Sequence, residues 1–131
     1  MNFPKIALIL LTVFSLTAIS RAQQEARHPG IILYEQGKYK EAAESLKNAV
    51  SKDPNKWNAR LWSDLGLSQT EKGEGKNAVK SLEKATALEP SNPSFRVNLS
   101  YAYLRNRQVN RSQAEAKKVI ELDPKRLTAY Y

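Results

Sequence analysis

The sequence predicts an all-α protein: an α-solenoid of three helix-turn-helix repeats plus the start of a fourth, preceded by a signal peptide. The first observation is a proline that recurs at nearly regular intervals. Pro54, Pro90 and Pro124 each follow an acidic residue and close an amphipathic run, at intervals of 36 and 34 residues. The second is helical periodicity within those runs, where apolar residues such as Ala78 and Leu82 recur at i and i+4. No stretch alternates as a strand does. Such a period is typical of helical arrays, whose repeats bury their cores against one another.

The middle unit has the most complete set of pattern residues. It carries Trp62, Leu65, Gly66, Ala78, Leu82 and Pro90. This set resembles the tetratricopeptide repeat (TPR) pattern, in which Trp, Leu-Gly and Tyr mark a first helix and Ala, Phe and Pro mark a second. Gln69 stands where the pattern has Tyr, and Leu82 stands for Phe. The resemblance implies antiparallel helix pairs that form a protein-binding scaffold.

The flanking units keep parts of the same pattern in phase. The last full unit keeps Leu99, Tyr103 and Pro124, and replaces Trp, Gly, Ala and Phe by Arg96, Ser100, Ser112 and Ala116. The first unit keeps Gly30, Ala42 and Pro54, with Leu46 for Phe and Pro29 for Leu. Repeats are therefore expected at about residues 23–56, 59–92 and 93–126, with 127–131 starting a further helix. Six antiparallel helices, stacked as a right-handed solenoid, are expected at residues 29–36, 39–51, 58–72, 76–88, 93–106 and 112–122.

Small residues predict where paired helices cross. Two antiparallel helices approach closely only where neither carries a bulky side chain, so Gly66 is expected to face Ala78. In the last unit, Ser100 is expected to face Ser112. These pairings place the larger apolar residues between repeats.

Local signals predict several helix ends. Asn92 is suited to cap the helix that begins after it. Asn110 with Gln113 has the spacing of a capping box. Gly73 and Gly75 bracket the turn of the middle unit, where a positive φ is accessible to glycine without strain.

The N-terminus has the features of a secretory signal. Lys5 precedes a mostly apolar run at residues 6–19, and Ser20 and Ala22 are small residues at the positions that a signal peptidase reads. Cleavage after Ala22 is expected, which makes residues 1–22 a signal peptide and 23–131 the mature domain. The run of 14 residues is shorter than the roughly 20 needed to span a bilayer. An uncleaved signal anchor is the alternative, because Arg21 interrupts the cleavage site.

Composition favours an exported helical domain that binds protein rather than nucleic acid. The chain has no cysteine, so disulfide and thiol chemistry are excluded. Without residues 1–22, 19 basic residues face 13 acidic ones, a net charge of +6. The lysines are spread over the predicted second helices and turns, which is typical of a solvated face. Nucleic-acid binding favours charge gathered in one groove with aromatic residues between, and contact with anionic lipid is a further alternative.

Catalytic and cofactor sites are not expected. His28 is the only histidine and precedes Pro29 near the start of the array. One histidine without cysteine does not build a zinc site or a Ser-His-Asp triad. The sequence therefore predicts a protein that is not an enzyme and holds no metal or cofactor.

The first helix of each repeat carries a stripe that is expected to face a binding groove. Four positions per repeat share one helical face by their i, i+4, i+7 and i+11 spacing. They are Gln24, His28, Ile31 and Glu35; Arg60, Asp64, Leu67 and Glu71; and Ser94, Asn98, Tyr101 and Arg105. Ile31, Leu67 and Tyr101 form an apolar row flanked by both signs of charge, which predicts a peptide-like partner. The alternative is that this row only packs neighbouring helices.

The function expected from these observations is an exported, secreted or periplasmic TPR scaffold that binds a protein partner in its concave groove. The stripe does not resemble the carboxylate clamp of chaperone-binding TPR proteins, because Ile31, Asp64 and Leu67 occupy positions that the clamp needs. Two alternatives are a TPR segment of a longer envelope or secreted protein and a signal-anchored, membrane-associated assembly factor. No polar capping helix follows the last repeat, so an apolar face around Val119, Ile120 and Leu122 could also mediate self-association.

Overall fold

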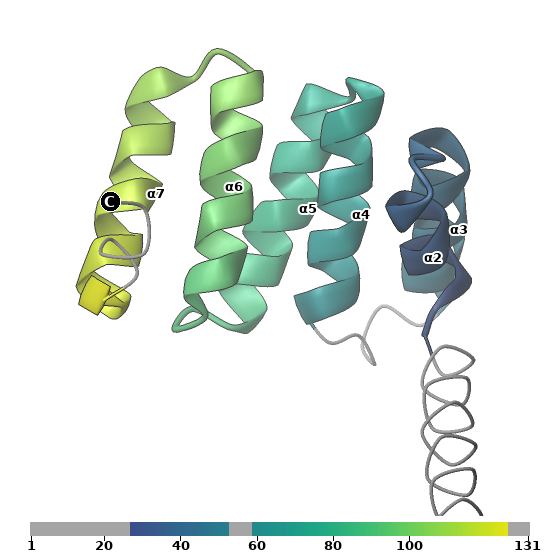
Figure 1. Cartoon of the computed structure of the whole chain (residues 1–131), viewed down its shortest axis with the longest axis horizontal. Coiled ribbons are helices and arrows are strands. Elements are labelled where there is room, and N and C mark those ends of the chain that lie inside the picture. The colour runs from purple at the N-terminus through teal and green to yellow at the C-terminus, as the bar shows by residue number, and fades with distance from the viewer. Residues whose placement is uncertain (1–26, 53–58, 126–131) are drawn as a thin grey trace, which may run out of the picture.

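A computed structural model describes residues 27–52 and 59–125, and these residues form six helices. The helices are α2 (Pro29–Glu35), α3 (Tyr39–Lys52), α4 (Ala59–Lys72), α5 (Gly75–Leu88), α6 (Pro93–Arg105) and α7 (Val109–Leu122). Each packs against the next, and α4 also contacts both α2 and α6. They form consecutive pairs, and Figure 1 shows these pairs following one another in chain order, from α2–α3 to α6–α7. The predicted all-α repeat fold is confirmed, while the predicted signal peptide and the predicted start of a fourth repeat at residues 127–131 lie outside the described residues.

The predicted helix crossings are confirmed. A Cβ atom on Gly66 would lie 2.5 Å from Leu82 Cγ and 3.1 Å from the backbone oxygen of Ala78. In the third pair, Ser100 Oγ donates to the backbone oxygen of Ser112 at 3.0 Å. Helices α4 and α5 are therefore in near backbone contact, whereas α6 and α7 are joined there by a hydrogen bond.

Most helix ends lie within a residue or two of prediction, but the start of α7 does not. Asn92 Oδ1 accepts a hydrogen bond from the Ser94 amide at 3.0 Å, as expected for a cap. The Asn110 capping box is wrong, because α7 begins earlier and its N-cap, Gln108, makes no side-chain cap bond. Arg107 adopts a positive φ of 58°, and the Gln108 amide bonds the Tyr103 carbonyl at 2.8 Å. This tight turn reverses the chain early and places Asn110 inside the helix.

The middle turn uses one of its two glycines as predicted. Gly73 has a positive φ of 88°. Gly75 is instead the first residue of α5, so its predicted role as a turn glycine is wrong. A Cβ atom on Gly75 would lie 2.6 Å from Asn106 Oδ1, so glycine at this position allows close approach to the end of α6.

The core lies between consecutive repeats. One cluster joins α3 to α4 through residues that include Leu46, Val50 and Leu65. A second joins α5 to α6, with Leu82 fully buried beside Tyr103. Burial at each interface is the packing expected of a repeat array. Among the described helices, none has the length and apolar character required to cross a membrane.

Candidate functional site

The stripe predicted from the sequence lies on the face formed by α2, α4 and α6, which we call the first-helix face. Direct contacts bring α4 and α6 together on it. Asn98 Nδ2 donates to Ser63 Oγ at 2.9 Å, and Tyr101 OH donates to Glu71 Oε1 at 2.7 Å. Hydrogen bonds between residues 30 to 35 positions apart in sequence therefore join α4 to α6, one at the face and one to the buried Ser63 beneath it.

Glu71, Tyr101 and Arg105 form the most connected group on the first-helix face. Arg105 Nη1 donates to Tyr101 OH at 2.7 Å and lies 3.4 Å from Glu71 Oε2. The Arg105 guanidinium also sits 5.7 Å from the centre of the Tyr101 ring. The hydrogen bond to Glu71, followed by burial, raises the pKa of Tyr101. The tyrosine in the predicted apolar row therefore has a fixed hydroxyl as well as an apolar ring.

Asp64 lies at the centre of the first-helix face. Arg60 Nε donates to its two carboxylate oxygens at 3.0 and 3.2 Å. Burial raises the pKa of Asp64, and the positive charge of Arg60 opposes that shift. Arg27 and Glu35 form a third ion pair at the α2 end of the face. In the described part of the face, these three acidic and three basic side chains are thus paired with one another.

The apolar part of the row is only partly covered. Ile31 is half-buried and packs against the core cluster between α3 and α4, while Leu67 is half-buried on α4. His28 caps α2, because its Nδ1 accepts a hydrogen bond from the Gly30 amide at 3.1 Å. Ser94 is exposed near the start of α6, and Gln24 lies outside the described residues. Of its four predicted stripe residues, the first repeat therefore contributes Ile31 and Glu35 to the described face.

Sequence reasoning missed an ion pair between α6 and α7. Arg96 Nη1 lies 2.9 Å from Glu115 Oε2, and the two side chains are only 15% and 11% exposed. Two further nitrogens of Arg96 donate to the Pro90 carbonyl. The replacement of the pattern tryptophan by Arg96 is the signal that could have pointed to a buried charge at this position.

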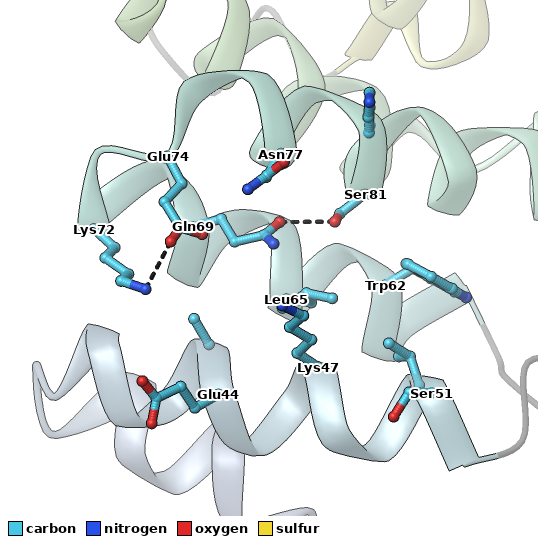
Figure 2. Close-up of a pocket in the computed structure, with 13 residues that line it drawn as sticks. Glu44, Lys47, Ser51, Trp62, Leu65, Gln69, Lys72, Glu74, Asn77 and Ser81 are labelled. Atoms are coloured by element: carbon cyan, nitrogen blue, oxygen red, sulfur yellow. Dashed lines mark hydrogen bonds and ion pairs between the residues drawn. The ribbon is translucent and has the colours of Figure 1, made fainter.

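A cavity of about 580 Å³ lies away from the first-helix face, between α3 and α5 with α4 as its floor (Figure 2). Its apolar lining comes from α3 and α4, and its polar lining from all three helices. The lining residues are Ala43, Glu44, Lys47, Val50, Ser51, Trp62, Leu65, Gln69, Lys72, Glu74, Asn77, Lys80 and Ser81.

The last repeat presents an apolar surface at its C-terminal side. Val97, Leu104 and Ile120 are 36%, 55% and 41% exposed. Their counterparts one repeat earlier are polar yet less than 9% exposed, because the next repeat covers them; they are Ser63, Thr70 and Thr86. The prediction that Val119 is exposed on this face is wrong, because Val119 is buried, whereas Ile120 and Leu122 are exposed as predicted. Self-association through this face stays a prediction.

The described residues contain no group of three histidine, cysteine or carboxylate side chains that could hold a metal ion.

Two family profiles match the chain. One, described as TPR repeat, matches residues 30–73, and the other, described as Tetratricopeptide repeat, matches residues 63–126. Together they run from α2 to beyond the end of α7. The matches include all three helix pairs of the described structure.

Two curated proteins are similar to part of the chain. The peroxisomal targeting signal receptor of Kluyveromyces lactis is 37% identical over 76 residues, which are 57% of this chain and 13% of the receptor. The receptor of the same description from Yarrowia lipolytica is 37% identical over 67 residues, 51% of this chain and 11% of that protein. The chain thus spans about an eighth of the length of these relatives.

Solved structures of low sequence identity share the fold. MamA 41-end from Desulfovibrio magneticus RS-1 has a TM-score of 0.68 at 22% identity, covering 91% of this chain and 71% of that one. The first TPR of Spaghetti (RPAP3), bound to HSP90 peptide SRMEEVD, has a TM-score of 0.65 at 22% identity. That match covers 72% of this chain and 74% of the other.

Proposed function

Since this chain belongs to the tetratricopeptide repeat family, we propose that it is a non-enzymatic scaffold that binds a peptide segment of a partner protein on the first-helix face. The observation that carries the proposal is the joining of α4 and α6 by the Glu71, Tyr101 and Arg105 group beside half-buried Leu67. A surface with an apolar anchor and oriented polar groups is suited to a short peptide. A distant structural relative, the first TPR of RPAP3, was solved with a bound peptide.

The charge pattern favours a peptide held mainly by apolar side chains. The three ion pairs, Arg27–Glu35, Arg60–Asp64 and Arg105–Glu71, leave the described part of the face without a surplus of either charge. Asp64 and Glu71 would oppose a ligand that ends in clustered carboxylates. The proposed ligand therefore differs in charge from the acidic SRMEEVD peptide of the RPAP3 structure.

A double substitution tests the proposed face. Peptides are first selected with the wild-type protein from a phage-displayed random library, and their Kd values are then measured. Leu67→Glu with Tyr101→Ala removes the apolar anchor and the hydroxyl between α4 and α6. We expect affinity to fall at least ~10-fold, equivalent to about 1.4 kcal/mol, because central aromatic and apolar contacts dominate such interfaces.

The matched control is Lys84→Glu, an exposed substitution on α5. It should bind the selected peptides as the wild type does. Circular dichroism and thermal unfolding show whether each variant is folded. If the folded double variant keeps wild-type affinity for every selected peptide, the first-helix face is not the binding site.

Export is the second part of the proposal and rests on residues 1–22 alone. Lys5, the apolar run and the small residues around the expected cleavage point support a secreted or periplasmic product. We expect mass spectrometry of the protein from its source cells to find an N-terminus at Gln23. An intact N-terminus in the membrane fraction would favour the signal-anchored alternative instead. Because the chain matches so little of its curated relatives, a TPR segment of a longer protein is the other alternative.

A further inference from the structure

The second and third repeats are bridged by a buried tyrosine. Tyr103 on α6 is only 6% exposed, and its hydroxyl donates to Glu83 Oε1 on α5 at 2.8 Å. Burial and this hydrogen bond raise the pKa of Tyr103 to about 12. The aromatic ring therefore packs between these repeats, and its hydroxyl reaches α5, the second helix of the middle repeat.

The same bridge is missing between the first and second repeats. Gln69 occupies the position of Tyr103, and Lys47 occupies that of Glu83. Instead of reaching α3, Gln69 turns toward α5, where its Oε1 accepts a hydrogen bond from Ser81 Oγ at 2.7 Å (Figure 2). Both of these counterpart residues, Lys47 and Gln69, line the cavity of about 580 Å³.

The cavity has an apolar floor and a rim with a surplus of positive charge. Val50 and Leu65 are buried core residues, and Trp62 lines one end. Three lysines and two glutamates form the charged part of the lining. Within the described part of the chain, Lys47 and Lys80 form no ion pair.

The two glutamates leave that surplus in place. Lys72 Nζ binds Glu74 Oε1 at 2.7 Å, so this pair is already neutral. Glu44 interacts electrostatically with Lys72, which places its charge near that pair. Lys47 also interacts electrostatically with Glu74, so the three lysines and two glutamates leave the lining with a net charge of +1, and Lys80 and Lys47 are its cations without an ion pair among the described residues.

We propose that this cavity is a second binding site, on a different face from the first, for an acidic peptide segment of a partner protein. An aromatic or aliphatic side chain of the segment packs on Trp62 and Leu65, and neighbouring carboxylates meet Lys47 and Lys80. The volume lies within the range typical of ligand pockets, roughly 300–1,000 Å³. Charge complementarity selects the acidic partner, since the rim offers unpaired ammonium groups beside an apolar floor.

Calorimetry with three acetylated hexapeptides tests the site on the full chain. The peptides have the sequences EEFFEE, KKFFKK and EESSEE. We expect EEFFEE to bind at least ~10-fold more tightly than either control, since only it combines an apolar anchor with carboxylates, and to weaken as salt rises. If EEFFEE does not bind, or if it binds no more tightly than KKFFKK, the proposal is wrong.

Two variants locate the binding. Lys47→Glu with Gln69→Tyr copies the Tyr103–Glu83 pair, so it should fill the cavity, keep the fold and abolish EEFFEE binding. Lys47→Glu with Lys80→Glu should reverse the preference toward KKFFKK. Unchanged EEFFEE binding by both folded variants would overturn the proposal. The Leu67→Glu and Tyr101→Ala double variant should still bind EEFFEE, which separates this site from the first-helix face.

Discussion

Replacement of Gly66 by leucine is expected to lower the free energy of unfolding by about 1–3 kcal/mol. The added Cβ alone would lie 2.5 Å from Leu82 Cγ and 3.1 Å from the Ala78 backbone oxygen. Leu82 is fully buried, so it has little room to move away. The α4–α5 pair must therefore separate, and the packing on both sides of it loosens. Urea unfolding followed by circular dichroism measures the loss.

Gly73→Asn is the matched control for that substitution. Gly73 has a positive φ, but a Cβ there would meet no atom within 4 Å. Asparagine tolerates this backbone region better than most residues, and Arg107 adopts it in the third repeat. The control should therefore change stability by less than about 1 kcal/mol. An unchanged unfolding midpoint for Gly66→Leu would contradict the close crossing of α4 and α5.

Replacement of Arg96 by alanine should lower the free energy of unfolding by about 2–4 kcal/mol. The substitution leaves the Glu115 carboxylate, 11% exposed, with Lys118 as its remaining cation at 2.9 Å. It also removes the guanidinium that donates to the Pro90 carbonyl. A buried charge that loses its partner is more costly than an exposed one, because water cannot replace the lost contact fully. Denaturant unfolding at low and high salt measures the effect.

The control for Arg96 restores the residues of the middle repeat. Arg96→Trp with Glu115→Ser copies Trp62 and Ser81, which occupy the same positions one repeat earlier. This double variant removes both buried charges together and fills the space with the tryptophan ring, and removal of a whole buried ion pair is often neutral, so it should regain most of the loss. If Arg96→Ala unfolds at the wild-type denaturant concentration, solvent already screens the pair and the ion pair does not stabilise the fold.

The parts of the fold that could be predicted from sequence depend on contacts that are local or that recur in each repeat of about 34 residues. Gly66 opposite Ala78 and Ser100 opposite Ser112 follow from the small residues that antiparallel helices need at a crossing. The Asn92 cap depends on a bond to an amide two residues away, so it too is encoded locally. The Asn110 capping box failed because the Arg107 turn, held by the Tyr103 carbonyl, begins the helix earlier.

The candidate site could be predicted only as a set of positions. The stripe follows from helical spacing, which places Leu67, Glu71 and Tyr101 toward one face without saying what each side chain contacts. The bond from Tyr101 to Glu71 joins residues 30 positions apart, and its geometry depends on how α6 lies against α4. The sequence showed that Gln69 replaces a pattern tyrosine, but the resulting cavity depends on the side chain turning to Ser81.

The sequence by itself determined that this protein is an all-α array of TPR helix pairs and where the second and third pairs cross, and it offered a stripe of candidate positions on the first helices. Only the tertiary structure decided that Arg96 pairs with Glu115 and that Ile31 packs against the core cluster between α3 and α4 as well as lying on the first-helix face. It alone also decided that a cavity lies between α3 and α5, the second helices of the first two repeats. The physical reason is the distance along the chain over which each kind of interaction acts. Periodicity and capping act within a few residues or one repeat, whereas ion pairs and cavities depend on side-chain rotamers and on the spacing between repeats.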